Sequence, residues 1–599
     1  MVFKKLLSLL TPPERKRLGL LLGMILVMAF LDVLGVASIL PFIAVLSNPE
    51  LVQTNTLLNT AFSISHYIGI YTTEQFLFAL GVSVFVLLVS SLAFRSLTTY
   101  AQIRFVLMRE YSISKRLLEG YLHQPYSWFL SRHSADLGKT ILSEVSLVVN
   151  GGITPFLTLT TQSTVSLAIV ILLIIVDPLL ALSVGVVLGL FYASIYAITS
   201  NLLNRLGQAR HVANKERYTA VSEAFGAAKE MKVSRLEQTY IQRFAKPAEI
   251  YAKGQATAAV IAQIPRFALE AIAFGGMLLI ILYLMLRGGS FTSSLPIITL
   301  YAFASYRLMP SLQQIYAAFA QLRFAGPAVN SLHQDLMNLQ VYEVQQDVIS
   351  PLSLTQAITL SQVSYRYPNA PQSAIKGIDI SIPAHSSVGF IGATGSGKST
   401  AVDVILGLLE PQKGSLNVDG QPITAANLRK WQKTIGYVPQ QIFLADDSVA
   451  ANIAFGEKVN NIDQVALERA AKMAKLHEFL INDLPQGYNT VIGERGVRLS
   501  GGQRQRIGIA RALYHKPKVI ILDEATSALD NFTEKAVMDE VIKLGHDVTV
   551  IIIAHRLSTI RHCDQLYLFD KGKLKASGTY QELFIASEHF RQLVEIDYD

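Results

Sequence analysis

Six long apolar stretches in the N-terminal part constrain the fold of this chain more than any other feature. A helix needs about 20 residues to cross a bilayer core about 30 Å thick, and each stretch is long enough or nearly so. They cover Leu18–Leu46, Phe76–Phe94, Phe156–Val176, Leu179–Ile198, Ala268–Leu286 and Leu295–Ala320. Between the third and fourth, Asp177-Pro178 predicts a tight turn, because proline cannot continue a helix and a charge avoids lipid. We therefore expect an α-helical membrane domain with six transmembrane helices.

The composition agrees with a membrane protein. Only 16% of the 599 residues are charged and 51% are hydrophobic, which is low and high, respectively, for a soluble chain. The net charge of +8 could indicate a nucleic-acid ligand. Basic residues that flank membrane segments on the cytoplasmic side explain this charge better, so no nucleic-acid partner is expected. The single cysteine, Cys563, excludes an intramolecular disulfide.

The distribution of basic residues predicts the orientation. Lysine and arginine gather before the first span and in two long polar stretches, Arg95–Pro155 and Thr199–Phe267. Positive charge of this kind stays in the cytoplasm. We expect an integral protein of the plasma (inner) membrane, with the N-terminus, both polar stretches and the C-terminal domain cytoplasmic. The two stretches are predicted to be helices that leave the membrane and turn back.

A further segment lies between the first two spans, on the outer side. Its apolar residues from Leu57 to Tyr71 recur at roughly helical spacing, with polar residues between them. Such a pattern suits a helix that rests in the outer headgroup layer. A loop packed on the ends of the spans would explain it equally well.

The C-terminal part lacks long apolar runs and carries a phosphate-binding motif. The strand-like Val388–Ile391 precedes the motif and the helix-compatible Ala401–Leu409 follows it. The pattern G-x4-G-K-[ST] is matched by Gly392, Ala393, Thr394, Gly395, Ser396, Gly397, Lys398 and Ser399. Glycines let backbone N–H groups surround phosphate oxygens at a helix N-terminus. Lys398 would supply a positive charge to the outer phosphates and Ser399 a hydroxyl to Mg²⁺, and Thr400 belongs to the same predicted ATP site.

A second motif supplies two carboxylates. The apolar Val519–Leu522 predicts a buried strand, and Asp523 and Glu524 follow it directly. Asp523 would reach the Mg²⁺ shell, and Glu524 would polarise the attacking water, a role that suits a carboxylate within hydrogen-bond reach. Taken alone, a strand that ends in these residues could also be an ordinary turn.

Between these two motifs lies Leu499-Ser500-Gly501-Gly502-Gln503. With the phosphate loop and the acidic strand end, this pentapeptide resembles the signature of the nucleotide-binding domain of ABC transporters. Ser500 and the amides of Gly501 and Gly502 would stand at a helix start and offer an anion site. In the family, this site, with Gln503, caps the terminal phosphate that the other subunit binds. The resemblance therefore implies a two-fold homodimer with two identical ATP sites.

Four more residues match family positions. The resemblance implies that Gln440 senses Mg²⁺, that His555 contacts the terminal phosphate, that Tyr367 stacks on adenine, and that Asp530 lies in the loop that touches the partner subunit. It also implies ATP and Mg²⁺ as cofactors and ATP hydrolysis coupled to transport. We expect a membrane domain at 1–330, a linker at 331–353 and an α/β P-loop ATPase domain at 354–599. Short coupling helices are expected near Tyr121–Phe129 and Ser222–Val233.

Charges in the spans indicate the substrate. Arg307 lies inside the sixth apolar stretch, and Arg95 and Arg266 lie at the inner ends of the second and fifth. An arginine in a membrane usually faces a cavity or a partner, and its planar fork suits phosphate. Alternatively, Arg95 and Arg266 extend to the interface, and Arg307 pairs with an acidic residue, Asp32 or Glu270.

The first span adds a finer resemblance. Phe30–Ser47 is similar to the flippases that turn over lipid-linked oligosaccharides, which implies a polyprenyl-pyrophosphate sugar as substrate and alternating access as mechanism. A multidrug, lipid or peptide exporter is the nearest alternative, and aromatic and sulfur-containing residues of the sixth stretch (Phe303, Tyr306, Met309) keep it open. An ATP-gated channel is disfavoured because both Glu524 and His555 are present.

Overall fold

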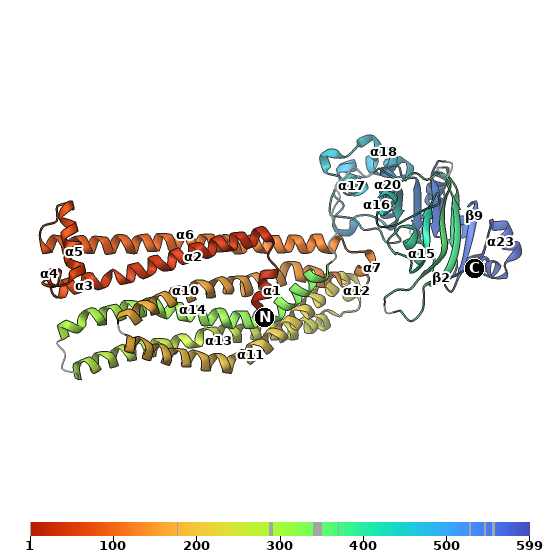
Figure 1. Cartoon of the computed structure of the whole chain (residues 1–599). Coiled ribbons are helices and arrows are strands. Elements are labelled where there is room, and N and C mark those ends of the chain that lie inside the picture. Colours follow the sequence, from red (N-terminus) through yellow and green to blue (C-terminus); the bar gives the residue numbers. More distant parts are fainter. Residues whose placement is uncertain are drawn as a thin grey trace. The chain divides into compact units, whose positions relative to one another are not determined.

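The computed structural model describes residues 2–176, 178–286, 291–339, 350–368, 370–525, 529–543, 547–553 and 557–598. Contacts divide the chain into two compact units. A helical unit combines Met1–Gln124 with Arg132–Tyr342, and an α/β unit combines Pro125–Ser131 with Glu343–Asp599. Figure 1 shows the helices of the first and the sheets of the second. A helical domain followed by an α/β domain confirms the predicted fold class.

The helical unit consists of long helices joined by short ones. Its elements are α1 (Val2–Ser8), α2 (Pro12–Ala37), α3 (Ile39–Ser47), α4 (Leu51–Thr54), α5 (Thr56–Ser65), η1 (His66–Ile68), α6 (Thr73–Leu122), α8 (Ser134–Lys139), the π-helical η2 (Thr140–Glu144), α9 (Val145–Val148), the π-helical η3 (Val149–Ile153), α10 (Thr154–Val176), α11 (Pro178–Gly226), α12 (Ala228–Val233), α13 (Glu237–Leu286) and α14 (Phe291–Asn338).

Within the described residues, four helical segments are long and apolar enough to cross a membrane. They are Pro12–Ser47, Thr73–Leu122, Ser134–Val176 and Ala181–Gly226. The fifth and sixth predicted spans fall within α13 and α14, where many side chains between 268 and 301 lie outside the described residues. The number of six spans therefore stays a prediction. Helix α14 continues to Asn338, past the start of the predicted linker.

Local sequence explains where these helices begin and end. Pro12 starts α2, where a missing N–H is harmless, and Thr11 with Glu14 forms a capping box. Helix α10 ends at Val176 and α11 begins at Pro178; Asp177, in the predicted turn, lies outside the described residues. Short helices also occur at the predicted coupling positions, namely α12 and, in the α/β unit, α7 (Tyr126–Phe129).

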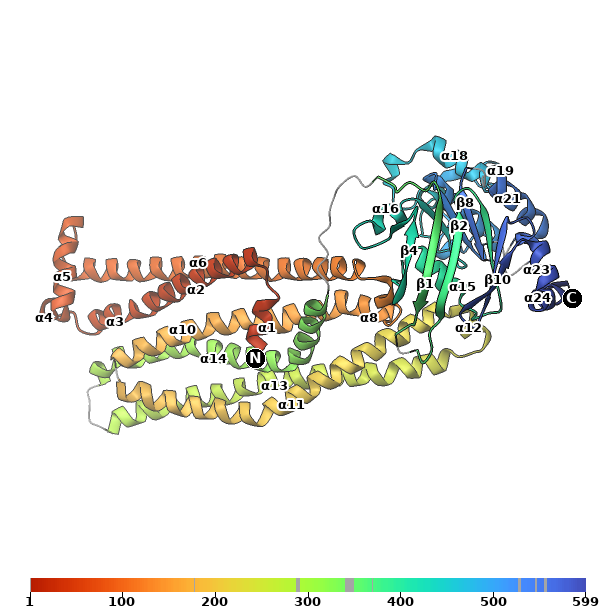
Figure 2. The same ribbon diagram turned by 45° about the vertical axis from the view of Figure 1, so that its right-hand side comes forward.

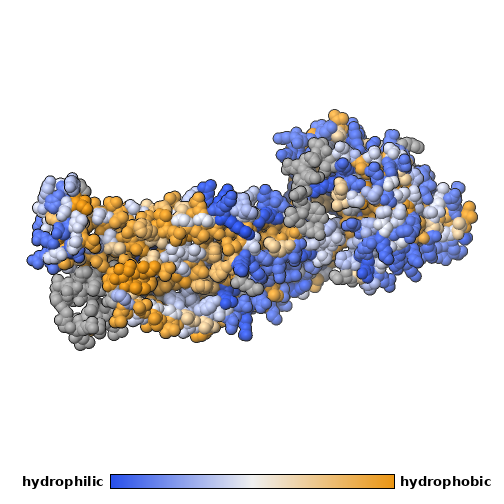
Figure 3. Space-filling view, viewed as in Figure 1, coloured by the Kyte–Doolittle hydropathy of each residue, from blue (hydrophilic) through white to orange (hydrophobic). Residues whose placement is uncertain are grey.

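The long helices run alongside one another. Helix α2 packs on α6 and α10, and α14 packs on α10, α11 and α13 (Figure 1). Hydrophobic side chains cover the middle of this unit, while hydrophilic ones gather towards its two ends (Figure 3). Many large apolar residues of α6 are exposed, among them Phe78 and Phe85. An apolar surface of this extent on a helical unit is expected where lipid covers it.

The segment between the first two spans is helical. Phe62, Leu58 and Ile70 pack on a small cluster made by Val45, Val52 and Phe76, and other apolar side chains point outward, with Leu57 82% and Tyr67 93% exposed. The segment therefore combines features of both interpretations, because one face packs on span ends and the other remains open to its surroundings.

The α/β unit contains two sheets (Figure 2). A four-stranded antiparallel sheet has the order β2-β1-β4-β5, and a six-stranded sheet has the order β10-β9-β3-β8-β7-β6, in which β9, β3, β8, β7 and β6 are parallel. The strands are β1 (Ala357–Tyr365), β2 (Ile375–Pro383), β3 (Ser387–Ile391), β4 (Lys413–Val418), β5 (Gln421–Pro422), β6 (Ile435–Val438), β7 (Val519–Asp523), β8 (Thr549–Ile553), β9 (Gln565–Asp570) and β10 (Lys573–Gly578).

Helices complete this unit. They are α15 (Lys398–Ile405), α16 (Leu428–Gln432), α17 (Val449–Ile453), η4 (Val459–Asn461), α18 (Gln464–Met473), α19 (His477–Asn482), η5 (Gly487–Asn489), η6 (Glu494–Gly496), α20 (Gly501–Tyr514), α21 (Asn531–Lys543), α22 (Leu557–Ile560), α23 (Tyr580–Ala586) and α24 (Glu588–Tyr598).

Strand β7 shows why the six-stranded sheet is central. Val519 and Ile521 belong to the core shared with α15 and the antiparallel sheet, while Ile520 and Leu522 belong to the core shared with α20 and α21. Successive side chains of a strand point to opposite faces, so a continuous apolar run indicates burial on both.

Cys563 is buried after α22, and burial raises the pKa of its thiol to about 12.

Candidate functional site

The phosphate-binding motif forms the predicted strand, loop and helix. Strand β3 lies inside the sheet, and α15 begins at Lys398 after the glycine-rich loop. Gly392 has a φ of +144°, and a Cβ atom there would stand 2.2 Å from the carbonyl oxygen of Phe569 in β9. Only glycine fits such a backbone path. The loop therefore lies at the carboxyl edge of a parallel sheet, where ligands of open α/β sheets bind.

Lys398 folds back over this loop. Its Nζ atom donates to the carbonyl oxygens of Gly392 at 2.7 Å and Ala393 at 3.1 Å. Burial lowers the pKa of Lys398, whereas Glu524 and Asp523 act in the opposite direction. The ammonium group is thus held at the mouth of the loop, with two carboxylates near enough to favour its charge.

The loop also contains a polar atom that lacks a partner. The hydroxyl of Ser396 is buried, and among the described residues no group hydrogen-bonds to it. A buried hydroxyl normally has a partner, so this atom, the glycine path and the start of α15 fit an anionic phosphate group. Thr394 and Ser399 are exposed at the same loop.

The two carboxylates lie at the end of strand β7. The sheet order places β8 between β3 and β7, and β7 ends at Asp523. The side-chain amide of Gln440 donates to Oε2 of Glu524 at 2.5 Å, and the hydroxyl of Tyr437 donates to Oδ2 of Asp523 at 3.4 Å. The structure therefore brings three of the predicted site residues together, namely Gln440, Asp523 and Glu524, and adds Tyr437.

Magnesium suits this arrangement. No group of three or more His, Cys, Asp or Glu side chains that could hold a metal occurs in the described part of the chain. Mg²⁺ commonly takes one or two protein ligands and completes its shell with water and phosphate oxygens. The hydroxyl of Ser399 and the carboxylate of Asp523 are ligands of this kind.

Asp403 belongs to the same site but was not predicted. It lies one turn into α15, and burial, together with the Asp523 carboxylate, raises the pKa of its side chain to about 6. Its position in the helix-compatible run after the phosphate loop was visible in the sequence. The closeness of Asp523, at the end of β7, was not visible, because the order of the strands in the sheet brings that carboxylate near Asp403.

Tyr367 lies beside the first turn of α15. Its hydroxyl shares a hydrogen bond of 3.1 Å with Thr400, and its ring meets that of Tyr365 edge-on. Burial raises the pKa of this phenol. The ring is half-buried next to the loop helix, a position from which it could support a planar base.

The pentapeptide begins α20. Ser500 is the N-cap; its hydroxyl accepts from the backbone N–H of Gln503 at 3.2 Å, and the Gln503 side chain accepts from the N–H of Ser500 at 2.8 Å. In this capping box the hydroxyl oxygen of Ser500 accepts a hydrogen bond, and its O–H group does not act as a donor. Gly501 and Gly502 form the first turn of a 14-residue helix, whose N-terminus attracts anions.

The structure describes Asp530 but not His555, the other remaining residue of the predicted ATP site. Asp530 accepts from the backbone N–H of Thr533 at 2.9 Å, at the start of α21, and this bond lowers the pKa of its carboxyl group. His555 and the preceding loop residues Ser527 and Ala528 lie outside the described residues. Strand β8 lies between β3 and β7 and ends at Ile553, two residues before His555 in the sequence.

The structure settles the pairing of two of the three membrane arginines. Nη1 of Arg307 in α14 lies 3.6 Å from Oδ1 of Asp32 in α2. Arg266 pairs with Glu270 one turn along α13, at 2.8 Å. Asp32 is therefore the ion-pair partner of Arg307, and Glu270 is the ion-pair partner of Arg266. Arg95 is half-buried in α6.

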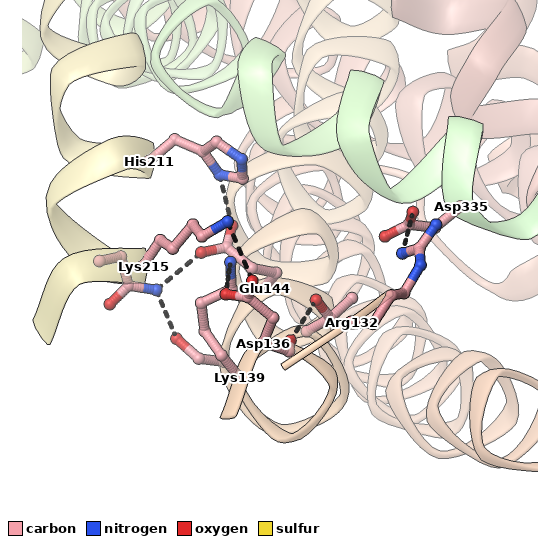
Figure 4. A network of polar contacts seen from close by, with 10 residues as sticks. Arg132, Asp136, Lys139, Glu144, His211, Lys215 and Asp335 are labelled. Carbon is pink, nitrogen blue, oxygen red and sulfur yellow. Dashed lines mark hydrogen bonds and ion pairs between the residues drawn. The ribbon is translucent and has the colours of Figure 1, made fainter. Parts of the chain in front are cut away.

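A polar network within the helical unit was not predicted (Figure 4). Asp136 pairs with Lys215 of α11 at 3.0 Å. Glu144, buried at the end of η2, accepts from Asn214 at 2.7 Å and faces His211 at 3.3 Å. This network joins the π-helical segment to α11. Such contacts between distant residues leave no local pattern in a sequence.

Together, the fold and the site define an integral membrane protein with a P-loop ATPase domain. A family model described as ABC transporter transmembrane region matches residues 22–315, and one described as ABC transporter matches residues 375–527. A relative from Cupriavidus pinatubonensis named ATP-dependent lipid A-core flippase is 31% identical over 487 residues, which cover 81% of each chain.

Two further comparisons agree. ABC transporter B family member 29, chloroplastic, from Arabidopsis thaliana is 32% identical over 67% of this chain and 63% of its own. A solved bacterial Atm1-family ABC exporter with ATP bound has the same fold, with a TM-score of 0.77 at 21% identity over 98% of both chains. The chain belongs to the ABC transporter family. Its one membrane domain and one ATPase domain make an exporter-type half-transporter that couples ATP hydrolysis to transport.

Proposed function

We propose that two copies of this chain form a transporter that flips a lipid-linked oligosaccharide, with a polyprenyl-pyrophosphate headgroup, by alternating access. The observation that carries the substrate class is Arg307, which lies inside the helical unit with 16% of its side chain exposed. Burying a guanidinium group between membrane helices costs free energy, and charged residues in such places usually serve a function. A planar fork of N–H donors suits a pyrophosphate group.

The ATP reaction follows from the residues of the α/β unit. The loop amides and Lys398 would bind the phosphates, and Ser399, Asp523 and Gln440 would hold Mg²⁺, which neutralises phosphate charge when bound. Glu524 would accept a proton from the attacking water, and Gln440 keeps that carboxylate in place through its 2.5 Å hydrogen bond. His555 would contact the terminal phosphate.

A homodimer follows from the pentapeptide. Each chain has one phosphate loop and one capped α20. We propose that Ser500 and the amides of Gly501 and Gly502 meet the ATP that the other copy binds, with Asp530 close to the same interface. Two-fold symmetry completes both sites at once, and it doubles the arginines around a central pathway.

The location follows from the same assignment. Basic residues in the N-terminal segment and the two polar stretches support an inner-membrane protein with a cytoplasmic ATPase domain. The relative from Cupriavidus pinatubonensis is named for a lipid cargo, which supports a lipid substrate for this chain.

The substitution Arg307→Ala tests the substrate class. Purified protein in liposomes should lose flipping of a fluorescent polyprenyl-pyrophosphate sugar and stimulation of its ATPase by that lipid, but it should still bind ATP. Normal flipping by this variant would refute the proposal. Loss of ATP binding would instead indicate a folding defect.

One observation favours a second candidate, a multidrug exporter. Phe303, one turn before Arg307, and Tyr306, directly before it in the sequence, are 43% and 76% exposed, and aromatic faces bind hydrophobic compounds and cations. The two candidates differ in the liposome assay. Stimulation of the ATPase by uncharged or cationic drugs, with none by the pyrophosphate lipid, would favour drug export.

A further inference from the structure

Three polar residues from three helices meet inside the apolar part of the helical unit. Asp32 of α2 is 1% exposed. The hydroxyl of Ser91 in α6 donates to its Oδ1 atom at 2.5 Å, and Nη1 of Arg307 in α14 lies 3.6 Å from the same oxygen. The other carboxylate oxygen, Oδ2, is buried and has no hydrogen-bond partner among the described residues.

The surroundings of this group are apolar. Neighbouring residues of α2 and α14, namely Met28, Ala29 and Ala304, form a buried cluster with Val165 and Ile169 of α10. These side chains offer no polar group that could replace a lost partner of Asp32. A carboxylate in such a place depends on the positive charge of Arg307.

The pair is also loosely held. A charge-assisted hydrogen bond between a guanidinium and a carboxylate spans about 2.7–2.9 Å, whereas these two atoms are 3.6 Å apart. Ser91, not Arg307, makes the short bond to the carboxylate. Arg307 can therefore turn towards another anion while Asp32 stays fixed to α6.

We propose that Asp32 is a built-in competitor for the anionic headgroup, which binds to Arg307 only by displacing this carboxylate. The inference rests on the proposed function. Each time the headgroup is bound, a buried charge loses its partner, so headgroup binding is weakened and release is favoured. Asp32 is thus a residue that sets affinity through Arg307 and need not touch the lipid.

The substitution Asp32→Asn tests this, because it removes the charge and keeps the size and the acceptor for Ser91. In nanodiscs without ATP, the variant should bind a fluorescent polyprenyl pyrophosphate roughly fivefold more tightly than the unaltered protein. By competition, a fivefold change means that Arg307 pairs with Asp32 about four-fifths of the time in the ligand-free protein. Flipping by Asp32→Asn should be slower, because release is slower.

Three further variants separate the outcomes. In an Arg307→Ala background, Asp32→Asn should change binding no further. Asp32→Glu keeps the charge and should bind the lipid like the unaltered protein. Glu14→Gln is a matched control, because Glu14 and Arg109 form another buried ion pair between α2 and α6, and it should leave lipid affinity unchanged.

Several results would overturn the inference. Unchanged or weaker lipid binding by Asp32→Asn would do so, and so would an equal gain in the Glu14→Gln control. Asp32→Ser is a second neutral variant; if both neutral variants fail to fold while Asp32→Glu folds, the carboxylate is structural and the inference fails. Normal lipid binding by Arg307→Ala would refute the proposed function itself, whereas loss of binding there with no effect of Asp32→Asn refutes only the competition.

Discussion

The substitution Glu524→Gln separates ATP binding from ATP hydrolysis. Glutamine has the length of glutamate, and its side-chain oxygen can still accept the bond that Gln440 donates at 2.5 Å. The backbone at Glu524 has a φ of +50°, and two residues without branching at Cβ tolerate this conformation equally. The shape of the site should therefore persist, and only the negative charge and the proton acceptor are lost.

The expected size of the effect follows from that loss. General-base catalysis by a positioned carboxylate contributes about 10²–10⁴-fold to the rate, which corresponds to about 3–5 kcal/mol of activation free energy. Binding should change little, because Lys398 and the loop amides remain. Asp523 also remains beside Lys398 and favours its charge.

Two measurements on the full-length protein in nanodiscs check this prediction. Phosphate release at saturating Mg·ATP gives the rate, and equilibrium binding of a fluorescent ATP analogue gives the affinity. Glu457→Gln serves as a matched control, since Glu457 is an exposed carboxylate of the same unit, and it should hydrolyse ATP normally. A Glu524→Gln rate above about a tenth of the normal rate would contradict the assigned role.

Two more predictions concern the same unit. Gly392→Ala should abolish ATP binding, because the new Cβ atom would stand 2.2 Å from the Phe569 carbonyl oxygen; binding of the fluorescent ATP analogue measures it, and normal affinity would contradict the assigned loop geometry. Asp403→Asn should change the pH dependence of stability, because burial raises the pKa of Asp403 to about 6. The folded state then keeps this proton when the unfolded chain has lost it, so the unaltered protein loses stability as pH rises from about 4 to about 6. Asp403→Asn should therefore raise the free energy of unfolding by about 1–2 kcal/mol at pH 8, after allowance for partial exposure, and by almost nothing near pH 4. Melting temperatures at pH 5 and 8 measure this trend. An equal shift in melting temperature at both pH values would contradict it.

Features with a local cause could be predicted from the sequence. The phosphate loop needs glycine at Gly392 and a lysine at the helix start, and strand β7 needs a continuous apolar run, so each left a pattern. The short helices α7 and α12 likewise occur where polar stretches were expected to turn. These elements depend on residues within a few positions of one another.

Features that depend on distant residues could not be predicted. Asp403 gains its raised pKa from burial and from Asp523, which is 120 positions away in the sequence. The sequence left two acidic partners open for Arg307, and only helix packing distinguishes Asp32 from Glu270. The π-helical η2 places Glu144 against α11, and no residue pattern within η2 predicts that turn.

The burial of Cys563 has a practical consequence. Cys563 is 6% exposed and burial raises the pKa of its thiol to about 12, so access to the sulfur and the fraction of reactive thiolate are both small at neutral pH. Since the chain has no other cysteine, we expect the unaltered protein to be a silent background for site-directed labelling. A cysteine introduced in place of Tyr67, which is 93% exposed, could carry a spin label or fluorophore without prior removal of Cys563.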